Sequence, residues 1–338
     1  MGRTNRYLLS QFLSVFGSLF FTLFFITSVI YFIQIARITS VIKITFFELG
    51  KLYLFLLPKV FIFTFPITFF IALAIVLFKL SRENEMIVLF TLGHAPQKIA
   101  KFFLAISSLL SLFLVINVLV LMPLSKDLQA NFVDYKKAEA KFNIEATEFG
   151  QKFSDWFVFV NGAGKDYYKG IVLYSEYENK DRIISATEAF ISNDSGEISL
   201  ELSGGKAYEI TKSKIDQLDF GTMLMRTLLS GSVKEVGGVK AYWQNIFTSS
   251  GRAWDFVFYL CIALFPLATT LFALSFGIVT YRYERASIYI MISLVIISYF
   301  ALISLLGRLH PIGSLALIFM LFFALSYTVF RRKILKRF

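Results

Sequence analysis

Six long apolar runs, separated by short charged segments, dominate the pattern of hydrophobic and polar positions along the chain. Each run holds roughly 20 apolar residues, which is the length that an α-helix needs to cross a bilayer. The runs cover about residues 7–35, 60–80, 99–122, 253–281, 287–306 and 312–330. No small-residue cleavage signal follows the first run, which is also too long for a signal-peptide core. The pattern therefore predicts six transmembrane helices, the first of them retained.

The polar stretch between the third and fourth runs has a different pattern. Residues 126–148 are charged and compatible with a helix that extends the third run. β-branched and aromatic residues then alternate with polar ones between turn signals such as Asn161-Gly162 and Gly204-Gly205. The predicted strands are 156–160, 170–177, 182–192, 198–202, 207–211 and 217–226. We therefore expect a membrane α-helical bundle with an inserted all-β domain, a sandwich or jelly roll.

The pattern divides the chain into three segments. Residues 1–124 hold the first three helices, residues 125–251 the β domain, and residues 252–338 the last three helices. Within the β domain, Trp156, Val158, Val160, Ile171 and Leu173 are expected to face inward, toward a simple core or toward an apolar groove. One sequence does not separate these two arrangements.

Composition supports a membrane protein. The chain is 57% hydrophobic, with 40 Phe, and only 17% charged, against about 25% in soluble domains. Its net charge of +11 is unevenly distributed: residues 125–251 carry 15 Lys and Arg against 18 Asp and Glu, and the rest carries 19 against five. This basic membrane portion favours lipid headgroups or an anionic membrane substrate over nucleic acid. One cysteine and two distant histidines predict no disulfide and no metal site.

The orientation follows from basic residues in the short loops, which mark the cytoplasmic side. With six helices, the N-terminus, the loop after the second run, the turn after the fourth run and the C-terminal tail share one side. Their basic residues are Arg3, Arg6, Lys79, Arg82, Lys98, Lys101, Arg282, Arg285, Arg331, Arg332, Lys333, Lys336 and Arg337. We expect this side to be cytoplasmic and the β domain to lie on the other side.

The most informative segment follows the second run. It has a charged start at Arg82, Glu83 and Glu85, an amphipathic turn, and a stop at Gly93. These features predict a short helix at the membrane face over about residues 81–93. The segment resembles the coupling segment of the LptF/LptG (YjgP/YjgQ) permeases of lipopolysaccharide export.

Other parts of the chain resemble the same family. The matching segments are 65–67 in the second run, 265–269 in the fourth run, and 184–186 with 202–208 in the β domain. The order of three helices, a β insert and three helices also matches, so the resemblance covers nearly the whole chain. The Glu85-Met86 step favours LptF over LptG. His94 departs from the family, which more often has a small or hydrophobic residue there.

The resemblance implies a permease subunit of an ATP-driven ABC exporter that extracts lipopolysaccharide from the inner membrane for transport to the outer membrane. The implied partners are a homologous LptG-like or LptF-like permease, an LptB-like ATPase dimer and an LptC-like periplasmic bridge protein, in addition to lipopolysaccharide and membrane lipids. The chain has no GxxxxGK[ST] loop, so we expect no enzymatic activity and no cofactor of its own. Both termini would lie in the cytoplasm, and the β domain in the periplasm.

Glu85 is the expected contact with the ATPase, because an acid on a short rigid helix can dock through charge-assisted hydrogen bonds. Arg82 and Glu83 lie beside it in the sequence. Met86, Leu89 and Phe90 would fill a groove of the ATPase, as a docked amphipathic helix requires. From residue chemistry alone, an ordinary solvated loop helix is the alternative.

Basic residues near the outer helix ends are the expected substrate contacts, because lipopolysaccharide carries phosphates and positive charge is least expected on that side. They are Arg37, Lys43, Lys51, Lys59 and Arg308. The alternative for each is snorkelling to lipid headgroups.

Two other classes of function are open at this point. A membrane enzyme would need a catalytic motif, but the chain has no HExxH, no GxSxG and no paired carboxylates within the apolar runs. A sensor or scaffold subunit of another ABC-type complex would need no coupling helix. Co-purification of an ATPase and a second six-helix permease would distinguish the exporter from both.

Overall fold

The computed structural model describes residues 2–39, 44–142, 151–153, 156–163, 167–177, 180–194, 197–211, 214–228, 238–244, 250–278, 287–307 and 311–335. Two of the predicted substrate residues, Lys43 and Arg308, lie outside these ranges. The chain forms two compact units. A helical unit comprises residues 1–37, 46–128 and 236–338, and a second unit comprises residues 38–45 and 129–235.

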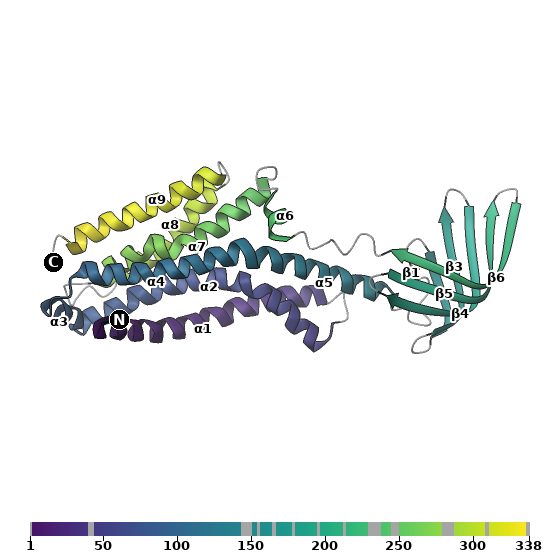
Figure 1. The fold of residues 1–338 in the computed structure, drawn as a ribbon, viewed down its shortest axis with the longest axis horizontal. Coiled ribbons are helices and arrows are strands. Elements are labelled where there is room, and N and C mark those ends of the chain that lie inside the picture. Colours follow the sequence, from purple (N-terminus) through teal and green to yellow (C-terminus); the bar gives the residue numbers. More distant parts are fainter. Residues whose placement is uncertain are drawn as a thin grey trace. The chain divides into compact units, whose positions relative to one another are not determined.

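Six stretches of the described residues are helical, long and apolar enough to cross a membrane. The helices are α1 (Arg3–Thr39), α2 (Phe46–Arg82), α3 (Glu85–Thr91), α4 (Pro96–Ile116), α5 (Met122–Phe142), α6 (Gly238–Gln244), α7 (Ser250–Gly277), α8 (Ser287–Leu306) and α9 (Pro311–Phe330), with π-helical turns η1 (Asn117–Leu121) and η2 (Arg331–Leu335) (Figure 1). The prediction of six membrane helices is therefore confirmed.

Helix α2 begins at Phe46, well before the predicted start at residue 60. The apolar sequence before Pro58 continues the helix, so Lys51 and Lys59 are helical residues and do not lie in a preceding loop. Pro58 and Pro66 both lie inside α2. Long membrane helices tolerate proline where neighbouring helices and hydroxyl side chains satisfy the freed backbone groups.

Helices α2 and α7 form the centre of the helical unit, and most of their apolar residues are buried. Several of their buried hydroxyl side chains are satisfied within the helix. The Thr64 and Thr68 hydroxyls in α2, and those of Thr269 and Thr270 in α7, donate to the carbonyls four residues earlier. Such bonding lets hydroxyl side chains lie in an apolar core without an unsatisfied group.

A close approach joins the ends of α2 and α7. The Ser81 Oγ atom donates to the carbonyl of Gly277 at 2.9 Å. A Cβ atom added at Gly277 would lie 2.5 Å from the Cβ of Leu77 and 2.9 Å from the carbonyl oxygen of Ala74. Only glycine fits at this crossing, as is common where membrane helices pack closely.

One turn of the third membrane span is π-helical. This turn, η1, packs against both α2 and α7 and begins at Asn117, which is fully buried. Within the described part of the chain, neither the amide nitrogen nor the carbonyl oxygen of its side chain has a hydrogen-bond partner. Single π-helical turns inside α-helices occur frequently at functional sites.

The second unit contains one antiparallel sheet. Its strands are β1 (Gln151–Phe153), β2 (Trp156–Ala163), β3 (Tyr167–Tyr177), β4 (Lys180–Asp194), β5 (Glu197–Thr211) and β6 (Lys214–Leu228), and each pairs with the next. The predicted inserted all-β domain is thus present. The sequential strand order is a meander, which differs from the two-sheet arrangement of a sandwich.

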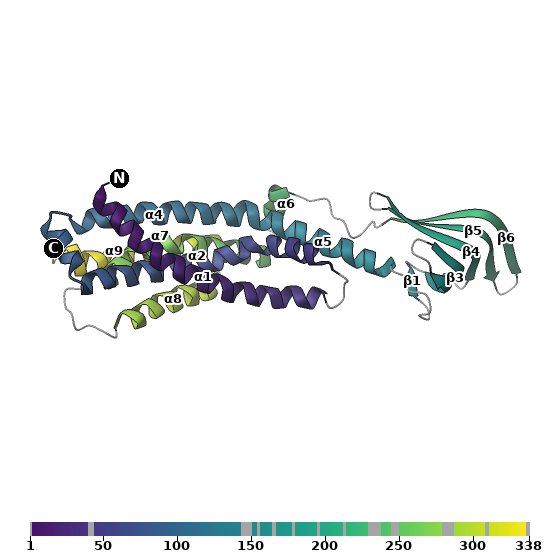
Figure 2. The ribbon, with the colours of Figure 1, turned by 90° about the horizontal axis from the view of Figure 1, so that it is seen from below.

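The predicted turn at Gly204-Gly205 is wrong, because both residues lie inside β5. The two predicted strands on either side of them are one strand. Regular pairing is interrupted at Asn161, Gly170, Thr187, Gly204 and Gly221, which lie beside one another on β2 to β6. This row is a crease across the sheet, and Figure 2 shows the strong bend of β5 and β6.

Positive backbone angles explain the crease. Gly170 and Gly204 both have φ of 61°, a conformation that costs glycine little. The Thr187 hydroxyl donates to the carbonyl of Gly204 at 2.7 Å and supplies a partner at the bend. The alternation of inward-facing and outward-facing side chains shifts by one residue at the bend. Leu200 and Leu202 lie before the bend of β5 and face the core. Ala207 lies after the bend and faces the same core.

The bent sheet encloses its own apolar core. Val158, Ile171 and Leu173 are buried, and Trp156 and Val160 pack against them. All five face inward as predicted. A flat single sheet would leave such a face open to water, so the crease is the device that lets one sheet bury these side chains.

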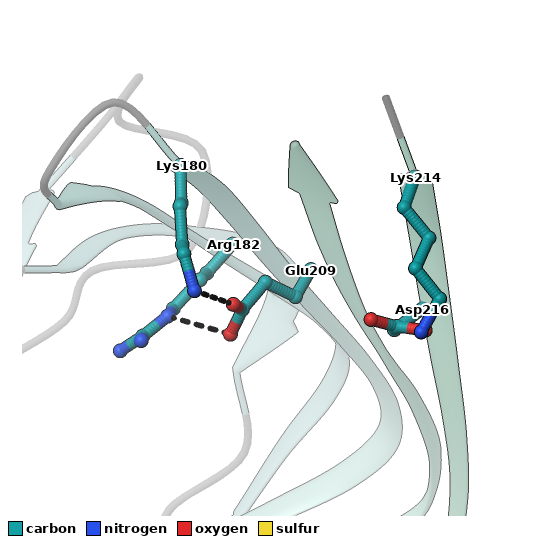
Figure 3. A network of polar contacts seen from close by, with 5 residues as sticks. All are labelled: Lys180, Arg182, Glu209, Lys214 and Asp216. Carbon is teal, nitrogen blue, oxygen red and sulfur yellow. Dashed lines mark hydrogen bonds and ion pairs between the residues drawn. The ribbon is translucent and has the colours of Figure 1, made fainter. Parts of the chain in front are cut away.

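Ionic pairs offset a like-charge contact near the end of β5. Glu209 lies directly opposite Asp216 in the strand register, which by itself is unfavourable. Lys180 Nζ and Arg182 Nε contact the two oxygens of Glu209 at 2.6 and 3.2 Å, and Lys214 contacts Asp216 at 2.6 Å (Figure 3). The hydrogen bond from Lys180 lowers the pKa of Glu209, so this carboxylate stays charged.

Candidate functional site

A short helix lies between the second and third membrane spans, where the sequence predicts the coupling segment. Helix α3 is preceded by Asn84, which has φ of 62°, and is followed by Gly93, which has φ of 82°. These two left-handed residues set the direction of α3 relative to the long helices on either side. Asparagine and glycine are the residue types that adopt this conformation most readily.

The helix is anchored to the helical unit by its apolar face. Met86 is 1% exposed and belongs to the main core, and Leu89 and Phe90 pack against that core. Met86 therefore packs within the bundle, whereas Leu89 and Phe90 remain partly exposed. The contact of these three side chains with the ATPase stays a prediction. The exposed apolar side chains of this segment are Ile87, Val88 and Leu92, the last of them 71% exposed.

Glu85 is held by the first turns of α1. The Tyr7 hydroxyl donates to Glu85 Oε2 at 2.5 Å. A second bond joins the same two segments, because Thr4 Oγ1 lies 2.9 Å from His94 Nε2. The sequence pattern did not indicate these contacts, since nearly the whole length of α1 and α2 separates the partners in the chain.

The two charged residues beside Glu85 are exposed. Glu83 lies in the turn before α3, and Arg82 is the last residue of α2. The Arg82 guanidinium lies 5.9 Å from the ring centroid of Phe78, one turn earlier. The structure thus brings Arg82, Glu83 and Glu85 together at the bundle end that also holds the N-terminus (Figure 1).

A cluster of charged and aromatic residues lies around Lys126, in the first turns of α5. Its ammonium nitrogen donates to the Tyr242 hydroxyl at 2.9 Å and lies 3.6 Å from Asp255 Oδ2. The same nitrogen lies within 6 Å of the rings of Tyr242 and Tyr259. Arg252 also contacts Tyr242, through its carbonyl at 3.3 Å and its ring at 5.6 Å.

Lys59 belongs to the edge of this cluster. Its ammonium lies 5.2 Å from the ring centroid of Tyr31, and it interacts electrostatically with Lys126 and Asp255. The cluster thus gathers three cations and one acid. Because Lys126 and Asp255 are each more than a third exposed, their mutual attraction contributes little to stability, about 0–1 kcal/mol.

Of the three predicted substrate residues in the described part of the chain, one joins this cluster. Lys59 is part of it, whereas Arg37 lies in the last turn of α1 and Lys51 in the early turns of α2, both exposed. Sequence reasoning missed Lys126 and Arg252. The signal that could have revealed them is positive charge at the ends of the long apolar runs that flank the β domain.

Within the described ranges, no group of three His, Cys, Asp or Glu residues could hold a metal ion. The six membrane helices, the inserted sheet and the short helix between two spans define a polytopic membrane protein with a β domain in the middle of its chain. The family model "Lipopolysaccharide export system permease LptF/LptG" matches residues 6–332, which is nearly the whole chain.

The chain therefore belongs to the LptF/LptG family of lipopolysaccharide export permeases. The family resemblance of the sequence is confirmed. Membership identifies an inner-membrane permease that serves lipopolysaccharide export, a transport component and not an enzyme in itself. No individual curated protein matches the chain significantly.

Proposed function

We propose that this chain is the membrane subunit of an ATP-driven exporter that extracts lipopolysaccharide from the inner membrane. It pairs with a homologous permease, takes its energy from an LptB-like ATPase dimer and passes the lipid to an LptC-like bridge protein. The Glu85-Met86 step favours the LptF type. Both termini and α3 face the cytoplasm, and the β domain faces the periplasm.

The mechanical connection of α3 to the bundle is the observation that supports a coupling role. A helix that transmits force from an ATPase must be fixed to the elements that move. Met86 is buried in the bundle core, and α1 holds Glu85 through Tyr7. A displacement of α3 therefore acts directly on the helices around it.

The surface of α3 suits a docked partner. Ile87 and Val88 are exposed, 40% and 53%, and Leu92 is more exposed still. Glu85 and Glu83 add negative charge beside this apolar surface. Because Glu85 already accepts a bond from Tyr7, its second carboxylate oxygen is the atom that we assign to the ATPase.

The cationic cluster suits the headgroup of the substrate. Lys59, Lys126 and Arg252 bring positive charge close together, and the tyrosines around them provide amphipathic surface. A phosphorylated sugar can bind lysine as a point charge and arginine in bidentate fashion. We assign the lipid phosphates to this cluster.

Replacing Glu85 tests the coupling role. Glu85→Ala and Glu85→Lys should insert normally but lose the co-purifying ATPase and lipopolysaccharide export, with the larger loss in Glu85→Lys. Glu176→Ala is the matched control, because Glu176 is an exposed acid on β3. Normal ATPase recovery and export in both Glu85 variants would remove Glu85 from the mechanism.

A transport assay in proteoliposomes separates the exporter from a sensor or scaffold subunit. A scaffold would retain its partners without moving lipid, so wild-type chain and partners in proteoliposomes would hydrolyse ATP with no release of lipopolysaccharide. Release that requires both ATP and intact Glu85 supports the exporter.

A further inference from the structure

An apolar groove runs along the surface of the helical unit between α7, α8 and α9. It has a volume of about 310 Å³ and is lined by residues such as Phe276, Met291, Leu294 and Leu325. Almost all of its lining is apolar. This volume is at the low end of the range for ligand sites, so the groove fits a narrow chain better than a bulky multi-acyl lipid.

A single cation lies at one end of the groove among the described residues. Lys333 Nζ lies 4.0 Å from the sulfur of Met291 and 5.6 Å from the ring centroid of Phe276, and both residues line the groove. Lys333 is exposed and lies in the π-helical turn η2, which follows α9. In the described part of the chain, no carboxylate forms an ion pair with Lys333 at this position.

From this juxtaposition we infer that the groove binds one acyl chain of an anionic glycerophospholipid whose phosphate contacts Lys333. The apolar walls can accommodate the acyl chain but offer no partner for a charged group. Arg331 and Arg332 precede Lys333, so the surroundings of its ammonium attract negative headgroups. The site lies apart from the Lys126 cluster and from α3, and it does not depend on the export role.

The chemistry favours a lipid over a protein segment. A partner helix packed on this surface would place apolar side chains beside Lys333 and leave its charge unpaired, which is unfavourable in a bilayer. A phospholipid covers the groove and supplies the anion at the same time. The groove is narrow, which argues against lipopolysaccharide as its occupant.

Photolabelling of the full chain, purified with its natural partners, tests this site. The protein is reconstituted in phosphatidylcholine vesicles that contain phosphatidylglycerol with a photoreactive group in one acyl chain. Labelled peptides are then mapped by mass spectrometry. We expect adducts on α8 and α9 at groove residues, and weaker labelling by the matching phosphatidylcholine probe.

Two pairs of variants make the result specific. Lys333→Gln should lower phosphatidylglycerol labelling about fivefold, the value expected for one basic residue near a membrane surface. Lys98→Gln, a change of an exposed basic residue on α4 that does not line the groove, should change it by less than about twofold. Leu294→Trp should fill the groove and remove the adducts, whereas Leu317→Trp, on the exposed surface of α9, should leave them.

Several results would overturn the inference. They are equal labelling by the two lipid probes, unchanged labelling in Lys333→Gln, crosslinks from groove residues to another polypeptide, and competition by lipopolysaccharide as strong as that by phosphatidylglycerol. Because Lys333 is exposed, Lys333→Gln should fold even if Leu294→Trp does not. Normal export in the Glu85 variants with groove labelling intact would count against the proposed coupling role alone. Absence of groove labelling in a wild-type chain that still exports lipopolysaccharide would count against this site alone.

Discussion

The bond between Tyr7 and Glu85 gives a quantitative prediction about the coupling segment. Tyr7→Phe removes only the hydroxyl that donates to Glu85 Oε2. A hydrogen bond to a charged group contributes about 1.5–3 kcal/mol when it is well shielded from water. Tyr7 is 38% exposed, so water competes for both partners and the value should fall to about 1 kcal/mol. The local opening equilibrium of α3 should therefore rise about fivefold.

Hydrogen exchange of the purified protein measures this opening directly. Amides of residues 85–93 should exchange about fivefold faster in Tyr7→Phe, whereas amides of α2 and α7 should be unchanged. Tyr289→Phe is the matched control, because this tyrosine is an exposed residue on α8. A double-mutant cycle with Glu85→Gln should give a coupling energy of about 1 kcal/mol.

Two results would refute this reasoning. If Tyr7→Phe leaves the exchange of residues 85–93 at the wild-type rate, α1 does not hold α3. If the effects of Tyr7→Phe and Glu85→Gln simply add, the two side chains do not interact in the protein. We also expect Tyr7→Phe to weaken ATPase binding without abolishing it, since Glu85 itself is retained.

Three further predictions concern the packing and the cationic cluster. Gly277→Ala should destabilise the purified protein by about 1–3 kcal/mol in thermal unfolding, because the added Cβ overlaps α2. The control Gly17→Ala meets no atom within 4 Å and should be neutral. Equal melting temperatures of the two variants would refute the close crossing. Gly204→Ala should lower the stability of the sheet by about 1 kcal/mol, because alanine is strained at this positive φ. The loosened bend should appear as faster amide hydrogen exchange in β5. An unchanged exchange rate would argue against the crease. Lys126→Gln should lower lipopolysaccharide photocrosslinking about fivefold, and Lys98→Gln should not; undiminished crosslinking in Lys126→Gln would exclude the cluster as the headgroup site.

The short helix illustrates which part of a site can be predicted from sequence. The charged start and the Gly93 stop predicted a helix between the second and third spans, and α3 lies there. The sequence did not predict which apolar side chains are buried. A helix of two turns has apolar residues on more than one face, so the neighbouring helices decide that Met86 packs inward and Leu92 outward.

The sheet illustrates the limit of local turn signals. Gly204-Gly205 is a typical turn sequence, yet it lies inside β5. The neighbouring strands also have Gly170, Thr187 and Gly221 at this level, and together these residues bend the sheet. A turn signal read along one strand cannot distinguish a reversal of the chain from a crease shared by several strands.

The sequence by itself determined the membrane class, the number of spans and the inserted β domain. These depend on the length of apolar runs and on alternation, which are properties of consecutive residues. Only the tertiary structure decided the contacts of Tyr7 with Glu85, Lys126 with Asp255 and Lys333 with Met291. Each contact joins residues from different helices, and the packing of those helices depends on the shapes of many side chains at once.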